Sequence, residues 1–140
     1  MELVDCPPWR LLVDREATLA AHALQAHGAP EGCECSMCRN FAANRGSAYP
    51  KAFLDLLRAL GVPPDRESEV YYLGRSRRGA HWYGGWFHLV GEITSGPAST
   101  PAEGGGVMHH LHSLTDVVSI GFHPASALIP DSLKGFKALQ

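Results

Sequence analysis

The sequence lacks a charge imbalance and a long apolar run. Its 12 basic and 14 acidic residues among 140 give a formal net charge of -2, which offers no broad positive surface to nucleic acid or an anionic membrane. No apolar stretch reaches the ~18–20 residues that a membrane-spanning helix needs, and the first residues do not resemble a signal peptide. We therefore expect a cytoplasmic protein whose partners include neither nucleic acid nor a membrane.

Common catalytic signatures are missing as well. The chain contains no G-x-S-x-G, no G-x-x-x-x-G-K and no G-x-G-x-x-G pattern, so it offers neither a serine nucleophile on a tight turn nor a glycine-rich phosphate loop. Because no complete catalytic set is present, we expect a non-enzymatic binding or interaction domain.

Charged residues are scarce for a soluble domain. They make up 19% of the chain, against about 25% in typical soluble domains, so part of the surface should be neutral or shared with a protein partner, such as a second copy in a homodimer. A length of 140 residues suits one domain with one core. We predict a single domain over residues 1–140, with a flexible glycine-rich loop at about 95–106.

Helical patterns occupy the first half of the chain. After a short apolar strand at Trp9–Val13, Asp14 is suited to cap a helix over Arg15–His27, and a short helical turn is expected over Met37–Asn44. Pro50 precedes the clearest amphipathic helix, which should end at Gly61.

Strand-like patterns fill the second half. Val70–Leu73 and a longer arm at His81–Ile93 predict a β-hairpin, and Val107–Leu114 and Val117–Phe122 predict two further strands. The chain should therefore have an α+β fold, in which an antiparallel sheet of four or five strands, mostly from the second half, packs against two or three helices.

Three of the four cysteines lie within six positions, at Cys33, Cys35 and Cys38. A C-x-C-x-x-C spacing lets three thiolates converge on one ion, and tetrahedral zinc then needs a fourth ligand. This zinc site, structural or hydrolytic, is the alternative to a simple interaction domain. Buried unpaired thiols and a redox pair or nucleophile are the other interpretations. The candidate fourth ligands are Cys6, His88, His109, His110, His112 and His123.

Aromatic residues with polar tips are concentrated between residues 81 and 88. Such residues line ligand pockets, although an aromatic stripe on a central strand also serves as core. The candidate pocket residues are His81, Tyr83, Trp86 and His88.

The cysteine segment Cys33–Phe41, the leucine helix after Pro50 and the segment Tyr83–Gly91 together resemble a family of small uncharacterised bacterial proteins. The resemblance extends from about Cys33 to Gly91. It implies a bacterial cytosolic origin and a single domain, and it implies no activity.

Overall fold

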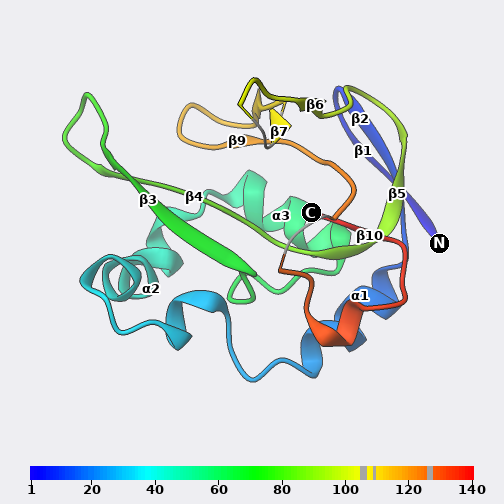
Figure 1. Cartoon of the computed structure of the whole chain (residues 1–140), viewed down its shortest axis with the longest axis horizontal. Helices are drawn as coiled ribbons and strands as arrows, with labels where there is room; N and C mark the ends of the chain where they lie inside the picture. The colour runs from blue at the N-terminus through cyan, green and yellow to red at the C-terminus, as the bar shows by residue number, and fades with distance from the viewer. Residues whose placement is uncertain (105–106, 109, 126–127) are drawn as a thin grey trace.

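The computed structural model describes the chain apart from residues 105–106, 109 and 126–127 (Figure 1). The elements in chain order are β1 (Glu2–Cys6), β2 (Trp9–Val13), α1 (Arg15–Ala23), η1 (Ala29–Gly32), α2 (Ser36–Ala48), α3 (Lys51–Leu60), β3 (Glu69–Arg75), β4 (His81–Trp86), β5 (Leu89–Ser95), β6 (Thr100–Pro101), β7 (Val107–Met108), β8 (His112–Ser113), β9 (Ser119–Ile120), η2 (Asp131–Leu133) and β10 (Ala138–Leu139). The α+β class is confirmed.

The largest sheet has four antiparallel strands in the order β1-β2-β5-β10. In its centre, Leu11 of β2 pairs with Ile93 of β5. The predicted number of strands is therefore confirmed, but the prediction that they come mostly from the second half is wrong for this sheet. Two of its four strands are N-terminal, because the β1–β2 hairpin supplies one half.

The helix boundaries differ from the predicted ones at two places. Asp14 caps α1 as expected, with its Oδ1 accepting a hydrogen bond from the backbone N–H of Ala17 at 2.9 Å. The helix ends at Ala23, before the predicted His27, and Leu24 beyond it is 79% exposed, so a further turn would bury nothing. Helix α2 continues through Gly46 to Ala48, whereas α3 ends as predicted at Gly61, whose φ of 75° suits glycine.

The predicted β-hairpin is present as β3 and β4, but its longer arm is not one strand. The chain leaves β4 after Trp86, and β5 begins at Leu89 and pairs with β2 in the large sheet. The long arm therefore serves two sheets in succession (Figure 1). The two strands of the hairpin approach closely at Gly85, because a Cβ on this residue would lie 2.4 Å from the carbonyl oxygen of Glu69.

The predicted strands over Val107–Leu114 and Val117–Phe122 form only short ladders. Two-residue strands pair as β6 with β7 and as β8 with β9. β6 also lies inside the loop predicted at 95–106. In a strand, His110 and His112 would lie on the same face, because side chains alternate between the two faces. His110 belongs to none of these strands, so this argument does not bring the two histidines together.

Helix α3 covers the large sheet and completes the main core. Its Leu57 and Leu60 pack with Leu11 and Val13 of β2, and Phe122 from the C-terminal segment joins them. No helix in the described part of the chain is long and apolar enough to cross a membrane.

Candidate functional site

The three clustered cysteines lie together on the loop that leads into α2. The sulfur atoms of Cys33, Cys35 and Cys38 all lie within 4.8 Å of one another. Cys35 is the N-cap of α2, and Cys38 lies in the first turn of this helix. The C-x-C-x-x-C spacing therefore brings the three thiols together, as the sequence predicts for a metal site. None of them forms a disulfide.

The surroundings of Cys35 favour its thiolate form. Its Sγ accepts a hydrogen bond from the backbone N–H of Cys38 at 3.4 Å and lies 3.3 Å from the Sγ of Cys33. The Cys38 N–H and the neighbouring thiols lower the pKa of Cys35 to about 7. Burial and the thiols of Cys33 and Cys35 raise the pKa of Cys38 to about 12. Cys35 can thus be a thiolate near neutral pH, whereas a bound cation would be needed to ionise Cys38.

The fourth ligands considered from the sequence lie elsewhere. No other described cysteine, histidine or acidic side chain joins the group of thiols that lie within 4.8 Å. Cys6 is buried in the main core, where burial raises its pKa. His88 is also buried, and its Nδ1 lies 2.7 Å from the hydroxyl of Ser68.

The histidines of the C-terminal half have other surroundings. The His112 ring lies edge-on to Trp9, with ring centroids 5.3 Å apart, and the Nδ1 of His123 contacts the carbonyl oxygen of Pro124. His110 is exposed. His109 lies outside the described residues.

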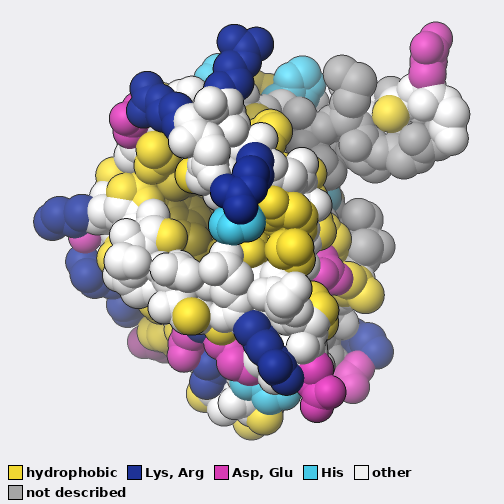
Figure 2. Space-filling view, turned by 90° about the vertical axis from the view of Figure 1, so that its left-hand side faces the viewer, with side chains coloured by type: hydrophobic (Ala, Val, Ile, Leu, Met, Phe, Trp, Pro, Cys, Tyr) yellow, Lys and Arg dark blue, Asp and Glu magenta, His cyan; other side chains and the backbone are white. Residues whose placement is uncertain are grey.

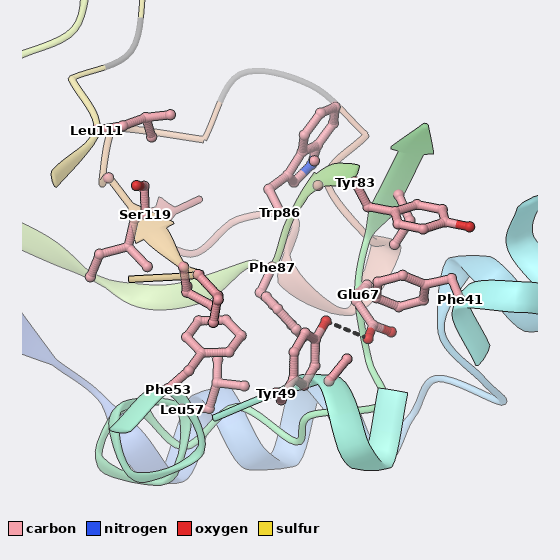
Figure 3. Close-up of a pocket in the computed structure, with 18 of the residues that line it drawn as sticks. Phe41, Tyr49, Phe53, Leu57, Glu67, Tyr83, Trp86, Phe87, Leu111 and Ser119 are labelled. Atoms are coloured by element: carbon pink, nitrogen blue, oxygen red, sulfur yellow. Dashed lines mark hydrogen bonds between the residues drawn. The ribbon is translucent and has the colours of Figure 1, made fainter. Parts of the chain in front are cut away.

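A cavity of about 990 Å³ opens between helices α2 and α3, the β3–β4 hairpin and residues 111–123. Figure 2 shows hydrophobic side chains gathered around a hollow on this side of the molecule. Aromatic rings from α2 and its C-cap, from α3, and from β4 and the residue after it line the cavity, as Figure 3 shows: Phe41, Tyr49, Phe53, Tyr83, Trp86 and Phe87.

Three of the four pocket residues suggested by the sequence line this cavity, namely His81, Tyr83 and Trp86. His88 does not. His88 lies between the end of β4 and the start of β5, and it is fully buried there. Trp86 is the most informative of the three, because its indole N–H is buried without a hydrogen-bond partner in the described part of the chain. Unpaired buried donors are uncommon in native structures.

One phenol joins the cavity to the cysteine loop. The hydroxyl of Tyr83 donates to the carbonyl oxygen of Met37 at 2.9 Å and accepts from the side-chain amide of Asn40 at 2.9 Å. Both partners lie in the first two turns of α2. The cavity wall and the thiol cluster are therefore attached to each other.

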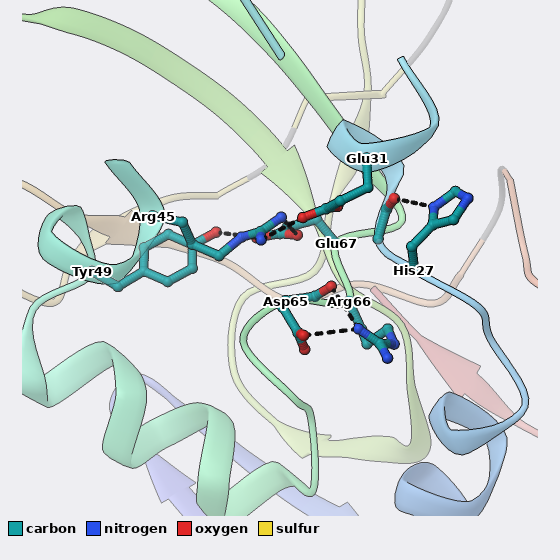
Figure 4. A network of polar contacts seen from close by, with 8 residues as sticks. His27, Glu31, Arg45, Tyr49, Asp65, Arg66 and Glu67 are labelled. Carbon is teal, nitrogen blue, oxygen red and sulfur yellow. Dashed lines mark hydrogen bonds and ion pairs between the residues drawn. The ribbon is translucent and has the colours of Figure 1, made fainter. Parts of the chain in front are cut away.

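An ion-pair network around the buried Glu67 lies next to the cavity (Figure 4). Two of its members, Tyr49 and Glu67, line the cavity. Glu67 is 2% exposed and accepts two hydrogen bonds from Arg45, at 2.7 and 2.8 Å, and one from the hydroxyl of Tyr49 at 2.9 Å. Arg45 also binds Glu31 of η1 at 2.6 Å. Burial raises the pKa of Glu67, and Arg45 opposes this rise. The network holds α2 against η1 and the start of β3.

Neither the helical half of the cavity nor this network is predicted by the sequence. Phe41 and Tyr49 carry no pattern that separates a cavity wall from core. Arg45 and Glu67 are 22 residues apart, and ion pairs at that separation have no local signature. The aromatic stretch at 81–88 is the part of the sequence that indicates a pocket, and it supplies one wall of the cavity.

Comparisons of the chain with protein-family models, with curated proteins and with solved structures find no match. The function must therefore be inferred from the chemistry of the site itself.

Proposed function

We propose that this protein is a metal-binding domain in which Cys33, Cys35 and Cys38 hold a zinc ion. The observation that carries the proposal is the approach of three thiols to within 4.8 Å of one another. Thiolate sulfur is a preferred ligand of zinc, and three such ligands on a short loop need little rearrangement to surround one ion. The low pKa of Cys35 lets the first ligand bind near neutral pH. Zinc affinity should decrease as the pH falls, because protons compete for the thiolates.

Metal content by mass spectrometry tests this proposal on protein purified without an affinity tag or added metal. We expect about one equivalent of zinc in the natural protein. A variant in which Cys33, Cys35 and Cys38 are all replaced by Ser should contain none, whereas Cys6→Ala should keep the metal. Metal-free protein whose Cys35 is alkylated rapidly, with a midpoint near pH 7, would contradict the proposal and favour the redox role.

A second candidate function is the binding of a small apolar molecule in the aromatic cavity. The observation that favours it is the buried indole N–H of Trp86, which has no hydrogen-bond partner among the described residues and lies beside a cavity lined by rings. These groups suit a ligand with a flat apolar body and one hydrogen-bond acceptor. Such a role agrees with the binding or interaction domain expected from the sequence.

The fluorescence of 8-anilinonaphthalene-1-sulfonate provides a test of this second function. We expect the dye to bind the folded protein and Ala48→Phe, at the rim of the cavity, to weaken that binding. The matched control is Ala52→Phe, which adds the same ring to an exposed position of α3 outside the cavity lining. Equal dye binding by both variants would count against a ligand in this cavity.

We also propose that the protein functions in a bacterial cytoplasm, as a homodimer. The free clustered thiols support a cytoplasmic location, because a reducing compartment keeps such thiols available to a metal. Exposed apolar side chains at the cavity rim, among them Tyr71, Leu73 and Trp82, support a surface shared with a second copy. The mass in solution, measured by light scattering, decides between monomer and dimer.

A further inference from the structure

A histidine outside the predicted set lies beside the cysteine loop. His27 precedes η1 and is exposed. Its ring packs over Gly32, the residue before Cys33: a Cβ on Gly32 would lie 2.9 Å from the Cε1 of His27 and 3.8 Å from its Nε2. Glycine at position 32 therefore leaves room for an imidazole next to the peptide that leads to the first thiol.

The hydrogen bond of His27 fixes which ring nitrogen is available. Its Nδ1 lies 2.7 Å from the carbonyl oxygen of Gly28. A carbonyl oxygen only accepts, so Nδ1 carries the proton and donates it. In the neutral ring Nε2 then keeps its lone pair. A histidine that binds a metal through one nitrogen commonly donates the other N–H to a backbone carbonyl in this way.

The loop between His27 and the thiols is held in place from both sides. The N–H of Ala29 donates to the carbonyl oxygen of Glu67 at 2.8 Å, and Glu31 is bound by Arg45 at 2.6 Å. Pro30 is buried between these contacts. His27 and Cys33 are thus the two ends of an anchored turn, and their positions do not depend on a mobile segment.

We propose that Nε2 of His27 is the fourth ligand of the metal held by Cys33, Cys35 and Cys38, an inference that rests on the function proposed above. Three thiolates and one imidazole form a common tetrahedral zinc set. The imidazole is not within the 4.8 Å group of thiols, so closure requires rotation of side chains. The thiols can make this movement, because Cys35 is exposed and Cys33 and Cys38 are partly exposed, and exposed side chains change rotamer within nanoseconds.

Cobalt(II) and zinc titrations of the untagged full chain test the assignment. We expect the natural protein to give the absorption of a tetrahedral cobalt site with three thiolates and one nitrogen. If four ligands share the binding free energy of a structural zinc site about evenly, His27→Ala should weaken zinc binding by roughly 100-fold and alter the cobalt spectrum. His27→Cys should restore tight binding with a four-thiolate spectrum. His110→Ala, an exposed histidine elsewhere, is the control and should change neither readout.

The outcomes separate this inference from the function beneath it. If the natural protein binds neither metal, the proposed zinc function fails and the assignment of His27 fails with it. If the natural protein binds zinc through thiolates and His27→Ala binds equally well with an unchanged cobalt spectrum, the zinc function stands and only His27 is excluded. The fourth position would then belong to Glu34, to water or to a second copy of the chain.

Discussion

Replacing Arg45 by Met should destabilise the protein by about 3–5 kcal/mol, because it leaves the Glu67 carboxylate buried without its cation. Met retains much of the apolar stem of the arginine but not its guanidinium carbon, which lies 5.6 Å from the centroid of the Phe41 ring. The hydroxyl of Tyr49 would remain as one donor to Glu67. Urea denaturation followed by circular dichroism measures the free energy of unfolding.

The loss should depend on pH in a definite direction. In Arg45→Met the pKa of Glu67 should rise further above its ordinary value of 4.5, because burial already raises it in the natural protein and the opposing cation is gone. A carboxyl with a raised pKa in the folded state is protonated there at a pH at which it is ionised in the unfolded chain. The penalty is therefore small below about pH 4.5, grows as the pH rises from there to the folded-state pKa of the variant, and is constant above that pKa.

Two further variants separate the buried charge from lost packing. Adding Glu67→Gln to Arg45→Met should recover part of the stability, because the stranded charge is removed. The control is Arg58→Met, which breaks an exposed pair with Asp55 and should change stability little. Equal losses at positions 45 and 58, or a loss at position 45 that does not depend on pH, would show that the buried charge is not the cause.

The second large effect is expected at Trp9, where Trp9→Ala should cost about 3–5 kcal/mol. Trp9 is 2% exposed, lies edge-on to Phe122 and donates its indole N–H to the carbonyl oxygen of Pro97 at 3.1 Å. One side chain of β2 therefore holds two later parts of the chain. Removing it opens a large cavity and also removes an interaction that orders those parts.

Trp9→Phe and Trp82→Ala complete this experiment. Trp9→Phe keeps a ring in the core but loses the bond to Pro97, so its cost should be smaller than that of Trp9→Ala. Trp82 is 59% exposed on the hairpin, and its replacement by Ala should have little effect on thermal unfolding. The interpretation fails if Trp9→Ala unfolds at the same temperature as Trp82→Ala.

The sequence predicted those elements whose signals are local. Asp14 marks the start of α1, and Gly61 ends α3 in the left-handed conformation, because capping depends on neighbouring residues. The division of the long arm after Trp86 could not be found this way. Strand propensity is continuous through that point, and pairing of β5 with β2, more than 70 residues earlier in the chain, decides the boundary.

The candidate sites show the same difference between local signals and long-range packing. The spacing of Cys33, Cys35 and Cys38 sufficed to predict that their thiols converge, because all three lie within six consecutive positions. The partners of those thiols could not be predicted, since six separate residues were compatible with a fourth ligand. His27 could have been considered from its position six residues before Cys33. Half of the cavity wall depends on how α2 packs against β4, which no local pattern contains.

The pairing of β2 with β5 has a consequence for the chain during synthesis. The β1–β2 hairpin must wait for a partner about 80 residues away, which at 5–20 residues per second corresponds to roughly 4–16 s on the ribosome. During that interval Trp9, Leu11 and Val13, all buried in the finished fold, lack the β5 side of their sheet, and Leu57 and Leu60 of α3 are the earlier-made residues that can cover them. The hairpin thus exposes apolar side chains on the nascent chain until these later elements emerge.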